Sequence, residues 1–408
     1  MKKSANTIGR INVKHRRAED PLASRLRRTQ RLRIGSGIAA IVGVALIALS
    51  CGGGLGSDAQ LPTTQPGRLT KILDDLAYAV AVPQYQATTA AFVELQGTTA
   101  AFCASPDASG LEAVRGAWRR AMESWVTAST IELGPIGDDN RDLRVAFWPD
   151  ANNNVARAVE QQLLRDDELS AATLAQQSVA GQGLPAFERL LFEPDADVLA
   201  AFTTGDRAAR RCTYAQAIAG NLVAIARAVE DGWTAEGGYA HQLAFAGRGS
   251  DVFATREAAI DDVVNGLVTT LAVTRDGRIG DPLGGDTAAD AKPFRAESFL
   301  SGNSLADLAA AVRGAGATYD AGGAFGFDDY LRSSGRDALA AEITAELRDL
   351  QARIAAIPVP LAAAVVDDAY RPAVVGLLDR ATALTRLIES ELSAAMDVTI
   401  GFNENDGD

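Results

Sequence analysis

The chain repeats apolar residues at intervals of three and four over most of its length, which is the period of amphipathic helices. The segment "RLTKILDDLAYAVAV" (68–82) shows this spacing before Pro83 interrupts it. No strand-like alternation, hairpin signal or βαβ pattern occurs. The pattern therefore predicts an all-α protein. In the segment 109–133, five large apolar residues share one helical face: Leu111, Val114, Trp118, Met122 and Trp125.

The expected helices divide into two groups around Gly237 and Gly238, whose flexible backbone punctuates the chain. We predict one helical bundle over 68–236 and a second over 237–408. Two connections are predicted as loops, 134–151 and the polar segment 275–304, and loops this long are often functional. Helices are expected at 68–82, from there to about 103, and at 109–133, 152–165, 168–178, 184–193, 211–235, 250–274, 305–317, 336–356 and 370–395.

The first fifty residues have the composition of a targeting signal. The apolar run "IAAIVGVALIAL" follows a basic segment and is too short to span a bilayer comfortably. Ser50 and Cys51 come next and resemble a lipobox, in which signal peptidase cleaves before an acylated cysteine. We predict a lipoprotein-type signal peptide at 1–50, lipidation of Cys51 and a flexible tether at 51–67. Because Gly52 and not Asp follows Cys51, we expect a periplasmic protein anchored by lipid at the outer membrane. An ordinary signal peptide or a short anchor is the alternative.

Charge is distributed unevenly. Residues 1–50 hold eleven Lys/Arg against two Asp/Glu, a surplus of +9, whereas the whole chain carries −13. The remainder therefore carries −22. A body this acidic is a poor nucleic-acid binder and raises the local concentration of cations.

Cys103 and Cys212 remain once Cys51 is assigned to the lipid. In an oxidising periplasm, an even pair of cysteines favours a disulfide. Two buried free thiols are the alternative.

The chemistry available beyond residue 50 is that of oxygen ligands. A spaced Cys/His zinc site and an HExxH motif are both absent, because His241 is the only histidine there. The terminal "NENDGD" has no room for the glutamate at the twelfth position of a calcium loop and is expected to be a polar tail. Three acids are the main candidates, and each has a structural alternative: Asp150 as a helix cap, Glu188 as an acid favoured by the helix dipole, and Glu297, beside Ser298, as a surface-loop acid.

Four motifs resemble, in order, those of the imelysin-like family of periplasmic proteins: "LGPIGDDNRDLRVAFWPD", which contains Trp148, "GLPAFERLLF", "RAESFLSGNSLADL" and "GFNENDGD". The similarity extends over nearly all of the chain after the tether. It implies an all-helical protein with two bundle-like domains and a functional site near their interface. The family's GxHxxE motif matches Gly183 and Glu188, but Pro185 stands at the histidine position.

The resemblance implies a link to iron uptake, and for the family's namesake a metallopeptidase activity. We expect a lipid-anchored envelope protein that binds iron or another divalent or trivalent cation, an iron-linked ligand or an iron-transport partner. Its ligands would be Glu188, Asp150, Glu297 and Ser298 in an interdomain cleft, with Arg144 or Arg295 neutralising the acids if no metal binds. The second hypothesis is a structural or interaction module of an envelope complex without metal. A metal-dependent peptidase is the weakest hypothesis, because Pro185 replaces the histidine and no base is evident.

Replacing Cys51 tests the predicted anchor. Cys51→Ala should block signal processing or release the protein from the membrane, because the acylated thiol would be lost. Membrane fractionation and the mass of the mature chain measure this directly. Unchanged fractionation together with an unchanged mass would rule out lipidation.

Overall fold

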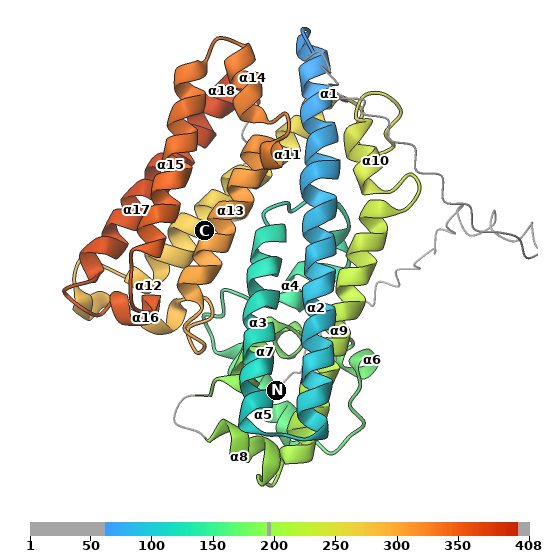
Figure 1. Cartoon of the computed structure of the whole chain (residues 1–408), viewed down its shortest axis with the longest axis vertical. Coiled ribbons are helices and arrows are strands. Elements are labelled where there is room, and N and C mark those ends of the chain that lie inside the picture. The colour runs from blue at the N-terminus through green and yellow to red at the C-terminus, as the bar shows by residue number, and fades with distance from the viewer. Residues whose placement is uncertain (1–61, 194–196, 399–408) are drawn as a thin grey trace, which may run out of the picture. The chain divides into compact units, whose positions relative to one another are not determined.

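The computed structural model describes residues 62–193 and 197–398, and every regular element within these ranges is helical (Figure 1). The predicted all-α class, with helices arranged in bundles, is confirmed. None of the described helices is long and apolar enough to cross a membrane. The predicted signal peptide (1–50), Cys51, the tether up to residue 61 and the "NENDGD" tail lie outside the described residues.

Pro83 does not interrupt the first helical segment as the sequence pattern suggested. Helix α1 (Gln65–Asp75) passes through a π-helical turn, η2 (Leu76–Ala81), directly into α2 (Val82–Ala104). Pro83 follows the π-helical turn, in which the Val82 N–H bonds to the Ala77 carbonyl, and this local change of hydrogen bonding lets the helix continue past a residue that has no N–H. Figure 1 shows these elements as one continuous rod in blue.

The first half of the chain is organised around α2, α3 (Ala108–Ala128) and α9 (Ala208–Thr234), with α2 packed along both of the others. Aromatic residues join them: the rings of Tyr85 and Trp233 stack with centroids 5.7 Å apart, and the Tyr85 hydroxyl donates to the Ile131 carbonyl at 2.8 Å. Shorter helices complete this half: α4 (Arg141–Val145), α5 (Asn154–Leu164), α6 (Ala171–Leu174), α7 (Leu184–Leu191) and α8 (Val198–Thr203).

The second half places α13 (Ser304–Asp320) against α15 (Asp337–Ala355), which in turn packs on α17 (Arg371–Arg386). The remaining helices of this half are α10 (Tyr239–Ala244), α11 (Arg256–Ala272), α12 (Asp281–Leu283), α14 (Phe327–Ser333), α16 (Leu361–Ala364) and α18 (Ser393–Met396). The π-helix η10 (Leu387–Leu392) connects α17 to α18.

The segment 275–304 was expected to be a loop throughout, and its first part is not. Helix α11 continues through a second π-helix, η6 (Val273–Gly280), into α12. Buried Thr274 and Ile279 give η6 an apolar side that packs on α17. Polar residues such as Arg275 and Asp276, which pair with each other at the surface, interrupt the apolar pattern of this segment. The helix was therefore not evident from the sequence.

The two halves meet where α13 packs against α3. A Cβ atom on Gly314 would lie 2.5 Å from the carbonyl oxygen of Thr127. Only glycine therefore permits this approach of the two helix backbones. The residues from Gln60 onward form one compact unit, and the division near residue 237 stays a prediction.

Cys103, near the end of α2, and Cys212, in the first turns of α9, form a disulfide with their Cα atoms 5.5 Å apart. The prediction from cysteine usage is confirmed, and the alternative of two free thiols is wrong. The bond fastens the ends of two helices that already pack side by side.

Removing the disulfide should lower the free energy of unfolding substantially. The two cysteines are 109 residues apart in sequence, and closing a loop of this length is worth about 5 kcal/mol in the chain-entropy model. A Cys103→Ser/Cys212→Ser variant should therefore unfold at a clearly lower denaturant concentration. Denaturant titration followed by circular dichroism measures the difference. Equal midpoints for oxidised wild type and variant would contradict this expectation.

Candidate functional site

Helix α7 begins at a tightly packed position. Gly183 is its N-cap, and a Cβ atom there would lie 2.2 Å from the carbonyl oxygen of Val145 at the end of α4. Pro185 occupies the first turn, and the Trp118 indole N–H donates to the Leu184 carbonyl at 3.0 Å. These contacts fix where α7 starts and so fix the position of Glu188 one turn later.

Glu188 is almost completely buried, with 5% of its surface exposed. Its Oε1 atom accepts a hydrogen bond from the backbone N–H of Ser301 at 2.8 Å, across 113 positions of sequence. Burial raises the pKa of the Glu188 carboxyl to about 7, the Ser301 hydrogen bond opposes this shift, and the nearby Glu297 charge adds to it. Glu188 therefore exchanges its proton near neutral pH.

The segment that faces α7 runs from the short 3₁₀ turn η8 (Pro293–Arg295) to the start of α13. Ser298 adopts a left-handed backbone conformation, with φ of 52°, which is unusual for a residue with a side chain. Its carbonyl accepts hydrogen bonds from the N–H of Asn303 at 3.2 Å and from the Ser301 hydroxyl at 3.1 Å. This turn aims the Ser301 N–H at Glu188.

Glu297 is buried in an ion pair that sequence reasoning did not find. The Arg278 Nε atom lies 2.8 Å from the Glu297 Oε2 atom, and both side chains are largely buried. The same guanidinium lies over the Trp148 ring, 5.4 Å from its centroid. A Cβ atom on Gly277 would lie 2.9 Å from that ring, so the glycine makes room for the indole.

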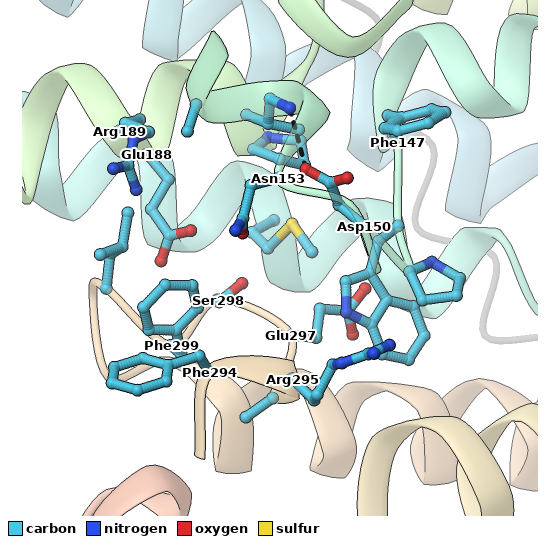
Figure 2. A pocket seen from close by; sticks show the side chains of 18 of the residues that line it. Phe147, Asp150, Asn153, Glu188, Arg189, Phe294, Arg295, Glu297, Ser298 and Phe299 are labelled. Atoms are coloured by element: carbon cyan, nitrogen blue, oxygen red, sulfur yellow. Dashed lines mark hydrogen bonds between the residues drawn. The ribbon is translucent and has the colours of Figure 1, made fainter. Parts of the chain in front are cut away.

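Glu188, Asp150, Glu297 and Ser298 all line one pocket, with a cavity volume of about 80 Å³. Figure 2 shows Glu188 and Arg189 at one end of it, and Asp150, Glu297 and Arg295 toward the other. The walls come from both halves of the chain. The other lining residues are mainly apolar and include Trp118, Met122, Phe147, Trp148, Pro149, Pro185, Phe294 and Phe299.

Asp150 has a structural role at this pocket. Its two carboxylate oxygens accept hydrogen bonds from the backbone N–H groups of Asn154 and Val155, at 2.9 and 2.8 Å. Asp150 thus caps the start of α5, which is the structural alternative that the sequence offered beside a ligand role (Figure 2).

The two arginines expected near the acids behave differently. Arg144 is directed elsewhere, because it donates to the side chains of Gln182 and Asn221. Arg295 lines the pocket, and no described residue forms a hydrogen bond or ion pair with its guanidinium. The arginine that neutralises Glu297 is Arg278. His241 stacks on Phe245 in α10 and does not line the pocket.

A further buried acid, Asp307, lies behind the pocket in the first turn of α13. It has no exposed surface, and Asn303 Nδ2 donates to its Oδ1 atom at 2.7 Å. Burial, and then the charges of Glu297 and Glu188, raise the pKa of Asp307 well above its usual range. Its position within "RAESFLSGNSLADL" was the signal that could have identified it, together with Ser301.

Among residues 62–193 and 197–398, no three Asp, Glu, Cys or His side chains gather closely enough to hold a metal ion. Asp150 has both oxygens committed to α5, and Glu297 is paired with Arg278. The described part of the pocket therefore does not fit a bare metal ion as the ligand.

Comparison with known proteins agrees with this architecture. The model of the imelysin family (Peptidase_M75) matches residues 81–388. This chain belongs to the imelysin family. Iron-regulated protein A of Synechococcus elongatus is 27% identical over 282 residues, which is 68% of each chain.

Two solved structures share the imelysin fold. An imelysin-like protein from Psychrobacter arcticum superposes with a TM-score of 0.68 at 21% identity, covering 83% of this chain and 98% of the other. A putative iron-regulated protein A precursor from Parabacteroides distasonis gives a TM-score of 0.67 at 16% identity, covering 82% and 96%.

The stability of this imelysin should depend on pH through Glu188. Because the folded-state pKa is raised to about 7, the native state holds a proton that the unfolded state has released above about pH 4.3. Its stabilising effect is complete below that pH and is lost as pH rises through about 7. At about 1.4 kcal/mol per unit over about 2.7 units, the loss approaches about 4 kcal/mol.

Glu188→Gln should remove this dependence. The stability of the variant relative to wild type should therefore rise between pH 4.5 and pH 8, as measured by chemical denaturation at each pH. Glu160→Gln, at an exposed position of α5, controls for the loss of a carboxylate. A constant difference between wild type and Glu188→Gln across this range would contradict the assignment.

Proposed function

We propose that this protein is a lipid-anchored imelysin of the bacterial cell envelope that captures an organic, iron-linked ligand in the pocket beside Glu188. The observation that carries the proposal is a pocket with a buried carboxyl group at one end, Arg295, which has no partner among the described residues, at the other, and aromatic walls between them. Such a mixture of apolar surface and few polar groups is typical of small-molecule sites.

The chemistry of the pocket favours one end of a larger organic molecule. A cavity of about 80 Å³ accepts a small group, and Phe294 extends the apolar surface outward, since 77% of its surface is exposed. Glu188 would accept a hydrogen bond from the ligand, and the Arg295 guanidinium would pair with an anionic group. Ferric complexes of organic chelators combine these features, and the donor set argues against a bare ion.

The link to iron rests on the relative named Iron-regulated protein A. The lipid anchor rests on the Cys51 motif, and an envelope iron-transport partner remains part of the proposal. Peptidase activity is not proposed, because Pro185 stands where the family motif has a histidine, and no histidine lines the described pocket.

One observation favours a second function, docking of a partner protein. Phe294 stands exposed at the rim, with its ring 5.6 Å from that of Phe299. An exposed aromatic residue of this kind is typical of the central contacts of protein interfaces. If the folded protein binds none of the small ligands tested, that result would support this second function.

Calorimetric titration of the full chain in mild detergent tests the proposed function. The titrants are ferric citrate, a ferric catecholate and a ferric hydroxamate, with ferric, ferrous, zinc and calcium ions as bare-ion comparisons. We expect saturable binding of at least one ferric chelate and no comparable binding of the bare ions.

Two variants locate the binding. Glu188→Gln should weaken binding of the chelate, because an amide oxygen is a weaker acceptor than a carboxylate. Arg295→Gln should weaken it at least tenfold, because it removes the cationic partner. Arg157→Gln, on the exposed side of α5, is the matched control. Unchanged affinity in both pocket variants, or equal binding of a bare ion, would overturn the proposal.

A further inference from the structure

A second cavity adjoins the pocket beside Glu188 and shares Trp148, Pro149 and Glu297 with it. Its volume of about 250 Å³ is larger, with room for several water molecules or a small ligand. The function proposed above does not use this cavity. Its other lining residues come from α3, the 129–146 region and the end of α11 with η6.

Two carboxylates of this cavity have no partner among the described residues. Glu132 and Asp142 line the cavity and are exposed to solvent, and no described residue donates a hydrogen bond to either side chain or forms an ion pair with it. Arg278, the only basic residue in the lining, is already bonded to Glu297. The cavity therefore carries a surplus of negative charge.

Glu297 supplies a second, independent observation. Its surface is only 5% exposed, and Arg278 donates to Oε2 alone. Among the described residues, Oε1 receives no hydrogen bond, although Glu297 lines the cavity. This oxygen can be reached from the cavity, so it can accept a hydrogen bond from a group that enters there.

The residues that line the cavity indicate which kind of hydrogen-bond donor could bind there. Trp125, Val126, Val273 and Trp148 give the cavity apolar and aromatic surface, which suits a carbon stem. Arg278 already lies over the Trp148 ring, so the Trp125 indole is the one that can favour a cation from a ligand. The acids do not form a cluster able to hold a metal ion within the described residues. An organic cation satisfies both the charge and the apolar walls.

We propose that this second cavity binds a small organic cation, an alkylammonium or guanidinium ion carried on a short apolar stem. The stem would lie along Trp125 and Trp148, and the cationic head would donate hydrogen bonds to Glu132, Asp142 and the free oxygen of Glu297. The source is a free diamine or the side chain of a lysine or arginine residue in a peptide.

Binding of the cation should strengthen as pH rises from 6 to 8. The protein around Glu132 raises the pKa of its carboxyl to about 7, Arg278 of η6 opposes this shift, and Asp142 of α4 adds to it. Glu297 faces the same cavity in its ion pair with Arg278. Below pH 7, a protonated Glu132 loses its attraction for a cation, so affinity should fall at least threefold by pH 6.

Calorimetry on the full chain in mild detergent tests the site with 1,4-diaminobutane, agmatine and Nα-acetyl-lysine amide. The first two represent free amines, and the third represents a lysine residue of a peptide. Butanol and calcium chloride test the need for a cationic head and for an organic cation. We expect saturable binding of at least one amine and none of butanol or calcium.

Variants separate this site from its neighbour. Glu132→Gln/Asp142→Asn should weaken the amine at least tenfold, whereas Glu160→Gln/Asp368→Asn, with the same change in net charge at exposed positions, should not. Glu188→Gln should leave amine binding within twofold and affect only the ferric chelate. Circular dichroism confirms that each variant is folded. Absence of amine binding, equal binding in the cavity variant, or tighter binding of calcium would overturn the inference.

Discussion

The hydrogen bond from the Ser301 N–H to the Glu188 carboxyl is the contact on which the pocket depends. A carboxyl group removed from water requires donors, or its burial is strongly unfavourable. Here the donor is a backbone group from the other half of the chain, 113 residues away. The bond holds the turn that carries Glu297, Ser298 and Phe299 against α7. This buried polar contact therefore joins the two sides of the pocket.

Charge around this contact is kept low by two different means. Glu297 is balanced by Arg278 in an ion pair, whereas burial favours the protonated forms of Glu188 and Asp307. Three acids can therefore lie near one another without a metal ion between them. Glu297 lines both cavities, so its ion pair with Arg278 borders the smaller cavity, which contains Glu188, and the larger one, which contains Glu132 and Asp142.

The helical class and the disulfide were predictable because they depend on local features of the sequence. Apolar periodicity fixes helices such as α3, and cysteine number together with compartment indicated the Cys103–Cys212 pair. The π-helices were not predictable, since a single inserted residue shifts the period and Pro83 resembles a stop signal. Short helices such as α8 and α10 lack enough turns to show a period.

Part of the site could be read from the sequence as well. The family-like motifs selected Glu188, Asp150 and Glu297, and the structure places them around one pocket. Whether they bind a ligand stays a prediction. The partners of Glu188 and Glu297 could not be predicted from the sequence, for physical reasons. The Ser301 contact uses a backbone N–H, which every residue except proline has, and Arg278 reaches Glu297 only because η6 continues as helix through a segment of polar residues.

The position of the disulfide along the chain has a consequence for the order of assembly. Both cysteines lie before residue 213, so a chain that emerges from its N-terminus can form this bond while the second half is still being delivered. The Glu188–Ser301 contact has the opposite property, because it requires a residue from each half. The disulfide between α2 and α9 can thus form early, whereas the pocket exists only after the segment up to α13 has arrived. A chain truncated before residue 293 would retain the disulfide and would have no site.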